Sequence, residues 1–408
     1  MVLMEAPPID FYDAIIIGAG PVGGYLGWKL TDLGHTVLII EEHAEIGRPF
    51  QCAGLVNPGA MERVPMRESV LSPIWGARIN SPNGITVDIG SSDRVRTWSV
   101  CRKKFDEGVV KLAVNNGAEL LLESRPTNIS ITDDFAEVSV KTRDGEKIYR
   151  CALVCGCDGA HSWVRRRMRM GRPKEMMIGY QLEVTGYCNE KGKLDMFTGS
   201  KIAPGFFAWA IPSGETTRIG MWSKAELLSE KSCEMMISYL MNNSIWKERF
   251  ENCSIIGRFG GPVPSGLIKR PLKERVALFG DASGACKPTT GGGIGNGFDQ
   301  VDILVSELSE SITEGNLSEA RMRKISKLLE PMRKKLERIR ALRNAFLTEA
   351  TDDELDEVFK VWSRPDVTEI INQSGEIDNP IPLGLRLLKE VPEFRSLATR
   401  AASAVIWG

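Results

Sequence analysis

Three glycines spaced as G-x-G-x-x-G constrain the fold of this chain more than any other feature. They are Gly18, Gly20 and Gly23, and they follow a short apolar run at 14–17. Such a run is typical of a strand that is buried on both faces. Leucines at helical spacing come next, and Gly34 predicts the end of a helix. The pattern indicates a strand, a tight turn and a helix, which is how a doubly wound α/β sheet begins.

A second apolar run, 37–40, completes this unit and ends at Glu41. In the turn, Gly18 permits the tight bend, Gly20 lets a pyrophosphate approach the backbone, and Gly23 allows close helix–strand packing. The helix start adds free amides and the positive end of a dipole. Because a carboxylate at the end of the second strand can bind a ribose diol, the segment predicts a dinucleotide site. An ordinary α/β turn without a ligand is the alternative.

Composition excludes several other classes of protein. With 408 residues, the chain is long enough for two or three domains. Its formal charge of −1 gives no general attraction to nucleic acid, so we expect no nucleic-acid partner. No apolar run reaches the roughly 18 residues of a membrane helix, and residues 1–10 lack the features of a signal peptide. Nine cysteines without a regular spacing fit a reducing cytosol, and with three histidines we expect no metal site. We therefore expect a cytoplasmic protein.

Two later segments distinguish between FAD and NAD. In the first, 152–166, an apolar strand leads into an Asp-Gly pair. In the second, 275–300, a strand leads into Asp281, and the glycine turn Gly291–Gly293 then opens a helix at Ile294. The carboxylate can accept a hydrogen bond from a ribityl hydroxyl, and the amides of the turn can hold the pyrimidine edge of a flavin, which gains negative charge on reduction. An NAD dehydrogenase does not need the second segment, so the pair favours FAD.

The three segments, in this order, resemble the p-hydroxybenzoate hydroxylase-like class of FAD enzymes. In that class an arginine at the start of a helix contacts the cofactor, and Arg102 holds this position. A solvated charge at a helix start is the alternative for Arg102. The cofactor-binding residues that we predict are Gly18, Gly20, Val22, Gly23, Glu41, Cys52, Ala53, Arg102, Thr127, Asp281, Gly292, Gly293 and Ile294. No second G-x-G-x-x-G marks a nicotinamide domain, so the electron donor stays open between NADPH, a ferredoxin and another reduced carrier.

Two stretches resemble one family within this class, the archaeal-type geranylgeranyl reductases. A cysteine near the flavin of geranylgeranyl reductases lies in a context similar to 47–56, GRPFQCAGLV, and Cys52 matches it. A buried structural thiol is the alternative. The archaeal-type enzymes carry P-x-x-Y-x-W-x-F-P in the substrate domain, and 204–212 is similar. Phe207 replaces the tyrosine and Ile211 the second aromatic residue, so the apolar face is kept and a hydroxyl is lost.

Bulky residues at every second position of 205–214 predict a strand with one bulky face, which ends at Pro212. That face is either ordinary core or the wall of a substrate pocket. The substrate-pocket residues that we predict are Pro204, Phe207, Trp209, Ile211 and Pro212, and the catalytic residues are Cys52, Phe207 and Trp209.

The same stretch is similar to the W-x-W-x-I-P element of flavin-dependent halogenases. In that case Lys201 or Lys287 is the candidate for the lysine that halogenases need. A flavin-dependent monooxygenase or halogenase acting on an aromatic or apolar substrate is therefore the alternative function. A flavin-binding protein without turnover is a third hypothesis.

The resemblance to geranylgeranyl reductases implies an α/β protein with a Rossmann-type FAD-binding domain, an inserted mixed-sheet substrate domain and a C-terminal helical region. The limits that we expect are 9–70, 100–172 and 260–318 for the discontinuous FAD-binding domain, 71–99 and 173–259 for the substrate domain, and 319–408 for the helical region. The implied activity is FAD-dependent reduction of carbon–carbon double bonds in the geranylgeranyl chains of prenyl glycerophospholipids, with hydride from reduced flavin N5. This is a step of archaeal-type membrane lipid biosynthesis. The implied partners are a prenyl lipid, held in an apolar cavity within 180–259, and an external electron donor.

The segment 321–343 carries ten Lys or Arg and only two Glu. Apolar residues at helical spacing form a stripe along it: Ile325, Leu328, Leu329, Met332, Leu336, Ile339 and Leu342. A basic amphipathic helix of this kind either presents a solvated face or rests on anionic lipid, which would place the protein peripherally on the cytoplasmic membrane face. Further helices are expected at 352–362 and 384–408.

Overall fold

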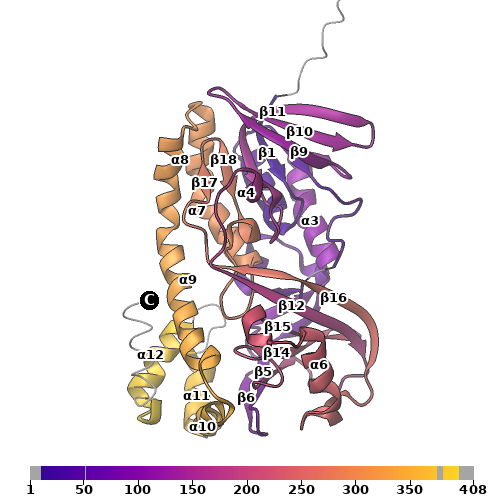
Figure 1. Cartoon of the computed structure of the whole chain (residues 1–408), viewed down its shortest axis with the longest axis vertical. Helices are drawn as coiled ribbons and strands as arrows, with labels where there is room; N and C mark the ends of the chain where they lie inside the picture. Colours follow the sequence, from indigo (N-terminus) through magenta and orange to yellow (C-terminus); the bar gives the residue numbers. More distant parts are fainter. Residues whose placement is uncertain (1–10, 51, 375–379, 395–408) are drawn as a thin grey trace, which may run out of the picture.

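The computed structural model describes residues 11–50, 52–374 and 380–394. Figure 1 shows two large sheets, one above the other, and a column of helices from the C-terminal part of the chain beside them. A third, separate sheet has three short strands: β3 (Leu55–Val56), β4 (Val70–Ile74) and β7 (Thr97–Val100).

The upper sheet has eight strands, and its parallel part has the order β18-β11-β1-β2-β8. The strands are β1 (Phe11–Ile17), β2 (Val37–Ile40), β8 (Glu119–Leu121), β9 (Arg125–Ile131), β10 (Ala136–Thr142), β11 (Gly145–Gly156), β17 (Leu272–Lys273) and β18 (Val276–Leu278). Antiparallel pairing adds β10 and β9 to β11, at the top of Figure 1. This is the Rossmann-type arrangement that the glycine pattern predicts.

Helices cover both faces of this sheet. α1 (Pro21–Asp32), α3 (Arg102–Asn115) and α7 (Ile294–Thr313) share a core with Ala14 and Ile16 of β1. Ile15 and Ile17 point into the opposite core, which includes α4 (Trp163–Arg167). The double burial of β1 is thus confirmed, and it places the glycine turn at the carboxyl end of a central strand. α7 begins at Ile294, as predicted.

The lower sheet has seven strands in the order β16-β12-β15-β14-β13-β5-β6. Their bounds are β5 (Gly76–Asn80), β6 (Thr86–Gly90), β12 (Glu175–Thr185), β13 (Lys193–Thr198), β14 (Phe207–Ser213), β15 (Thr216–Lys224) and β16 (Ser254–Ser265). The sheet is mixed because β13 runs parallel to β5 while the other pairs are antiparallel. β14 continues through Pro212 to Ser213, where it turns into β15, so the predicted strand end is one residue short.

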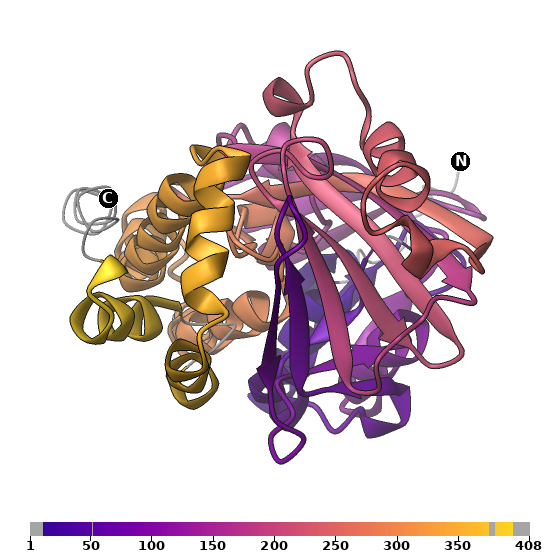
Figure 2. The same cartoon turned by 90° about the horizontal axis from the view of Figure 1, so that it is seen from below.

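One face of the lower sheet packs on helices and the other is directed toward the upper part of the molecule. Ala208 and Ala210 share a core with α6 (Cys233–Asn242), and the short helix α5 (Ala225–Leu228) follows β15. Figure 2 shows this sheet from below, with α6 on one side and the C-terminal helices near the β5–β6 edge. The expected domain limits stay a prediction. The limit at 260 falls inside β16, and β4 and β7 pair with each other.

The C-terminal helices are α8 (Glu319–Ser326), α9 (Glu330–Arg343), α10 (Asp352–Trp362), α11 (Pro365–Ser374) and α12 (Pro380–Glu390), and α2 (Pro58–Arg63) lies earlier in the chain. α10 confirms the helix expected at 352–362. α12 ends at Glu390, and residues 395–408 of the expected last helix lie outside the described residues. In the described part of the chain, no helix combines the length and the apolar character that crossing a membrane requires.

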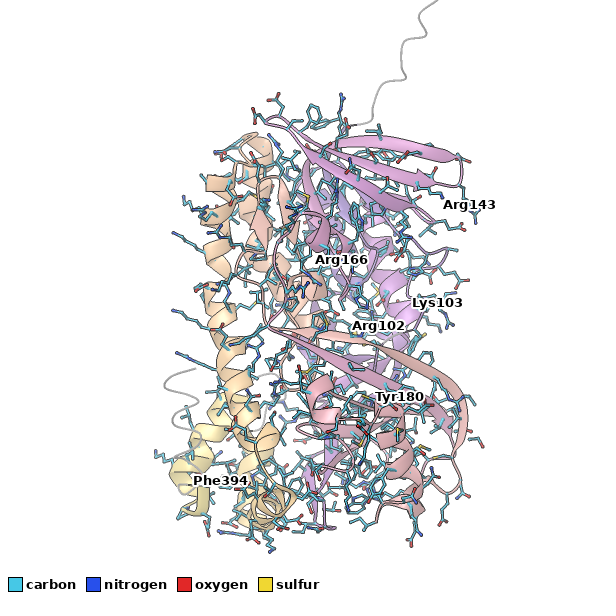
Figure 3. All side chains as sticks on the ribbon, in the orientation of Figure 1. Arg102, Lys103, Arg143, Arg166, Tyr180 and Phe394 are labelled. Carbon is cyan, nitrogen blue, oxygen red and sulfur yellow. The ribbon has the colours of Figure 1, made fainter. Side chains whose placement is uncertain are left out.

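The basic segment 321–343 is only partly a surface feature. Its apolar residues Ile325 and Leu336 are buried in the core of the upper part, as a helical stripe predicts. Arg340 and Arg343 are also buried, which contradicts the expectation that they belong to a basic outer face. Nitrogen-tipped side chains still project from the outer side of α8 and α9 in Figure 3. The exposed basic residues are Arg323, Lys324, Lys327, Lys334, Lys335 and Arg338.

Candidate active site

The turn from Gly18 to Gly23 connects β1 to α1 and is shaped by its glycines. Gly18 has a φ of +105°, and a Cβ there would lie 2.5 Å from the carbonyl oxygen of Cys157. A Cβ on Gly23 would lie 2.0 Å from the oxygen of Gly18, so neither position accommodates a side chain. Nothing lies within 4 Å of the Cβ position of Gly20, which leaves this backbone open to a ligand. The turn has the form that a pyrophosphate needs.

The carboxylate of Glu41 lies beside this turn, as its position after the second strand predicts. Its Oε2 accepts a hydrogen bond from the backbone N of Ala19 over 2.9 Å. Its Oε1 accepts one from the backbone N of His43 over 3.0 Å, and Nδ1 of the same histidine is 2.6 Å away. Glu41 is therefore held at the edge of the turn, where a ribose diol can reach it.

The two glycine-rich segments meet at Val22. A Cβ on Gly280 would lie 3.1 Å from Cγ2 of Val22, and one on Gly297 would lie 2.4 Å from the same atom. The segment that leads to α7 and the start of α1 are therefore neighbours. A single elongated ligand can contact both helix starts.

Asp281 packs against the second glycine turn, Gly291–Gly293. Its Oδ1 accepts a hydrogen bond from Cys286 Sγ over 3.0 Å and would lie 2.4 Å from a Cβ on Gly293. Burial raises the pKa of Asp281, while Cys286 and Arg102 oppose this shift. Because Asp281 is only half-buried, its carboxylate can accept a further hydrogen bond from a ligand hydroxyl.

Arg102 begins α3 and holds Asp106 through two hydrogen bonds, Nε to Oδ1 over 2.8 Å and Nη2 to Oδ2 over 2.7 Å. Burial lowers the pKa of Arg102, but the charge of Asp106 and the neighbouring Cys52 outweigh this and raise it. Burial mainly raises the pKa of Cys286 and the charge of Cys52 adds to this, so Cys52 lies close to both Arg102 and Cys286. Figure 3 labels Arg102 between the two large sheets. The structure thus brings Cys52 and Arg102 to the region of Asp281.

The aromatic face of β14 points toward the Cys52 loop. The rings of Phe207 and Trp209 are 6.4 Å apart, in an edge-to-face arrangement. Trp209 packs over Gly220, where a Cβ would lie 2.6 Å from Cζ2 of the indole. Trp209 and Ile211 share an apolar cluster with Ala53, the residue after Cys52. This face therefore packs partly on the loop that is predicted to lie at the cofactor.

Gln181 of β12 connects the aromatic face to this loop. Its Oε1 accepts a hydrogen bond from Trp209 Nε1 over 3.2 Å, and its Nε2 donates to the carbonyl oxygen of Cys52 over 3.4 Å. The residue is 5% exposed, so both ends of the amide are used in the interior. Gln181 therefore links the indole of Trp209 to the backbone of Cys52.

Arg218 of β15 holds the next residue of the loop. Its Nη1 donates to the carbonyl oxygens of Ala53 (2.9 Å) and Val100 (3.1 Å). A Cβ on Gly54 would lie 2.1 Å from the same nitrogen. Burial lowers the pKa of Arg218, and its Nε has no hydrogen-bond partner among the residues that the structure describes.

Sequence reasoning missed both Gln181 and Arg218. Their loop partners lie 129 and 165 residues away in the chain, so no local motif contains them. The available signal was a polar side chain inside a largely apolar strand, which needs a buried partner.

Some predicted residues lie apart from this cluster. Thr127 is exposed on β9 and donates to Ser139 O and Glu146 Oε1 within the upper sheet. Pro212 lies on the opposite face of β14 from Trp209, because successive strand residues alternate. Pro204 precedes the strand, and its carbonyl oxygen accepts a hydrogen bond from Ser223 Oγ over 2.8 Å.

The two lysines considered for halogenase chemistry differ in their exposure to solvent. Lys201 is exposed in the loop before β14. Lys287 is 8% exposed and lines a cavity of about 450 Å³ between α7 and α9.

The residues present fit FAD. Besides the open backbone at Gly20 and the glycine turn at Gly293, Asp158 supplies a buried acceptor. Its Oδ2 accepts a hydrogen bond from Val164 N over 2.9 Å, while its Oδ1 has no partner in the described part of the chain. Asp158 directly follows Cys157, whose oxygen faces Gly18. An acceptor without a partner therefore lies next to the pyrophosphate turn, at the edge of the proposed ligand site.

Comparison with known proteins agrees with this fit. Residues 12–326 match the family described as FAD binding domain. Over 322 residues the chain is 31% identical to digeranylgeranylglycerophospholipid reductase of Methanosarcina acetivorans. The matched region covers 76% of this chain and 78% of that protein. The chain is also 28% identical over 388 residues to an uncharacterized protein of Methanocaldococcus jannaschii, with 93% and 95% of the two chains covered.

Among solved structures, a geranylgeranyl bacteriochlorophyll reductase-like protein of Thermoplasma acidophilum has a TM-score of 0.85 at 21% identity, covering 96% of this chain and all of that one. A flavin-dependent brominase has a TM-score of 0.71 at 17% identity, covering 89% of this chain and 92% of that one. Both likenesses confirm the fold, and the brominase is a distant relative that does not favour the halogenase alternative. FAD is the cofactor, and the chain belongs to the digeranylgeranylglycerophospholipid reductase family of FAD-dependent oxidoreductases.

Proposed function

We propose that this protein reduces carbon–carbon double bonds in the geranylgeranyl chains of a prenyl glycerophospholipid. The single observation that carries the proposal is the link from Trp209 through Gln181 to Cys52. It joins an apolar aromatic face, suited to an isoprenoid chain, to the loop beside Arg102 and Asp281. The names of the family members support the same substrate class.

The chain's own residues would hold the cofactor at its two ends. The open backbone at Gly20 and the start of α1 would bind the pyrophosphate, and Glu41 would bind a ribose. Asp281 would accept a hydrogen bond from the ribityl chain, and the amides of Gly292 and Gly293 would face the pyrimidine edge. Reduced FAD supplies hydride when it is bound.

The aromatic face would orient the prenyl chain and exclude water from it. Hydride adds to one carbon of the double bond and a proton adds to the other, so positive charge develops on carbon as the proton arrives. The faces of Trp209 and Phe207 would stabilise that charge by ~0.5–2 kcal/mol. The histidines are placed elsewhere: His35 lies at Ser309, His43 at Glu41, and His161 is exposed. We therefore assign the proton to water near the site.

Two further points are part of this proposal. An external reduced carrier supplies the electrons, and the basic outer face of α8 and α9 rests on anionic lipid, close to the substrate. Flotation with neutral and anionic liposomes tests the second point. Binding that requires anionic lipid and weakens with salt supports it, and absence of binding at every salt concentration removes it.

Anaerobic rapid mixing tests the main proposal. The FAD-loaded protein is reduced with dithionite and mixed with a geranylgeranyl-chain glycerophospholipid. Reoxidation together with a gain of two hydrogens per double bond supports the reductase. Reoxidation only by oxygen, with transfer to an aromatic substrate, supports the monooxygenase or halogenase, and flavin that no acceptor reoxidises supports a carrier.

A further inference from the structure

Three cations surround one carboxylate where α9 meets the lower sheet, and two of the three, Arg340 and Arg343, are buried while Lys224 is half-buried. Glu175, at the start of β12, contacts Arg343 (Nη2 to Oε1, 2.8 Å), Arg340 (Nε to Oε2, 3.0 Å) and Lys224 (Nζ to Oε1, 2.6 Å). The side chains of Arg343, Arg340 and Glu175 are 0%, 5% and 10% exposed. Three positive charges against one negative charge leave a net charge of +2.

The excess of positive charge is not balanced locally. Among the described residues, Glu175 is the only acid in ion-pair contact with any of the three cations. Nη1 of Arg340 is buried and has no hydrogen-bond partner in the same part of the chain. Buried charges interact strongly because the surrounding medium screens them weakly. A cluster of this kind stabilises negative charge that develops nearby.

The cluster is in direct contact with the turn that leads to Gly291–Gly293. Nη1 of Arg343 donates to the carbonyl oxygen of Pro288 over 3.0 Å, and its guanidinium lies 4.8 Å from the ring of Phe206. The ring of Phe206 packs on Trp222, with centroids 5.1 Å apart. A Cβ on Gly291 would lie 3.5 Å from Cζ3 of Trp222. Helix α9 thus packs against the turn that leads to Gly291–Gly293.

We infer that the cluster of Glu175, Arg340, Arg343 and Lys224 is an electrostatic element of the flavin site that favours the reduced cofactor. Two electrons and one proton from the external donor add one net negative charge to the flavin. A net charge of +2 behind the turn lowers the free energy of that reduced form relative to the oxidised form. The inference rests on the proposal that the turn Gly291–Gly293 holds the flavin edge, and it does not depend on the lipid.

Variants that change the cluster charge in opposite directions separate this role from a structural one. Lys224→Met lowers the net charge to about +1, and Glu175→Gln raises it to about +3, on the charge count above. The midpoint potential of the FAD-loaded protein, measured against a reference dye without lipid, is expected to fall in the first variant and rise in the second. A tenfold change in the preference for reduced over oxidised flavin is about 30 mV for a two-electron couple.

Arg340→Met provides a second charge removal, with an expected fall in potential like that of Lys224→Met. Lys193→Met is the matched control, because Lys193 is paired with Asp88 and Glu190 and not with this cluster. Its potential should equal that of the unchanged protein. Shifts of the same sign in Lys224→Met and Glu175→Gln, or no shift in either, overturn the inference. Because no lipid is present, failure of the reductase proposal appears separately, as reduced flavin that the lipid does not reoxidise.

Discussion

The indole N–H of Trp209 donates a hydrogen bond to the side-chain oxygen of Gln181 across 3.2 Å. The other end of the same amide reaches the carbonyl oxygen of Cys52, which lies in the loop before β3 and 129 residues earlier in the chain. The side chain that would orient the substrate is therefore fixed relative to the Cys52 loop. The rate of hydride transfer depends on the distance between donor and acceptor. Displacement of Trp209 or of Gln181 should therefore lower the rate.

Replacement of Trp209 by alanine should slow reoxidation of reduced FAD by the lipid by about 2- to 30-fold. The reason is the loss of an aromatic face worth ~0.5–2 kcal/mol at the developing charge, where 1.36 kcal/mol is a factor of ten in rate. Trp209→Phe keeps a ring but loses the hydrogen bond to Gln181. Its rate should lie between those of the alanine variant and the unchanged protein. Stopped-flow absorbance measures the rates, and FAD content should be unchanged. An alanine variant as fast as the unchanged protein contradicts the pocket assignment.

Gln181→Leu should lower turnover while leaving FAD bound. The change leaves Trp209 Nε1 and the oxygen of Cys52 without their buried partner, at a cost of about 1–3 kcal/mol in stability. Gln373→Leu is a matched control, since Gln373 is exposed on α11 and bonds Glu369 and Arg386, neither of which belongs to the candidate site. Thermal melting and kcat are measured for both. If the control and Gln181→Leu have the same kcat, the link does not position the site.

Gly293→Ala should abolish or strongly weaken FAD binding. The new Cβ would lie 2.4 Å from Asp281 Oδ1, so either the turn or the carboxylate must move. Gly59→Ala is the control, because nothing lies within 4 Å of its Cβ position in α2. Fluorescence titration with FAD gives both affinities. Full FAD affinity in Gly293→Ala would show that the second glycine turn does not contact the cofactor.

Acid stability should depend on Glu175. Burial alone would raise its pKa, but Arg343, Lys224 and Arg340 lower the pKa to about 2 from its ordinary value of 4.5. A depressed pKa in the folded state adds stability above the unfolded pKa, and this stability is lost as the pH falls from about 4.5 toward 2. The contribution is up to about 3 kcal/mol.

Urea unfolding at pH values from neutral to acid checks this linkage. The difference in unfolding free energy between the unchanged protein and Glu175→Gln should shrink as the pH falls through that window. A difference that stays constant across it would mean that the carboxylate of Glu175 is not stabilised by the arginines.

Local glycine spacing is where the sequence was most informative. Gly18, Gly20 and Gly23 lie within six residues of each other, and Gly23 packs directly on the oxygen of Gly18, so a strand, a turn and a helix followed from local spacing. The contact of Gly18 with Cys157 comes from the end of a remote strand and was not predictable. The alternation of Phe207, Trp209 and Ile211 likewise predicted a shared face, because a strand has a fixed period of two. What covers that face was not predictable, since the Ala53 loop comes from a remote part of the chain.

Long-range charge pairs were the least predictable part. Arg340 and Arg343 occur in a run of basic residues that has the composition of a solvated helix face. Glu175, the acid that pairs with both arginines in the interior, lies more than 160 residues earlier in the chain. Only the packing of α9 against β12 reveals that these arginines belong to the interior, beside the turn that leads to Gly291–Gly293.

Anaerobic mixing of the dithionite-reduced, FAD-loaded protein with a geranylgeranyl-chain glycerophospholipid, followed by mass analysis of the lipid, shows whether the protein is a prenyl-lipid reductase. If it is, flavin absorbance recovers in step with lipid concentration and the lipid gains two hydrogens for each double bond reduced. A flavin that stays reduced until oxygen is admitted, with the lipid mass unchanged, would contradict this function.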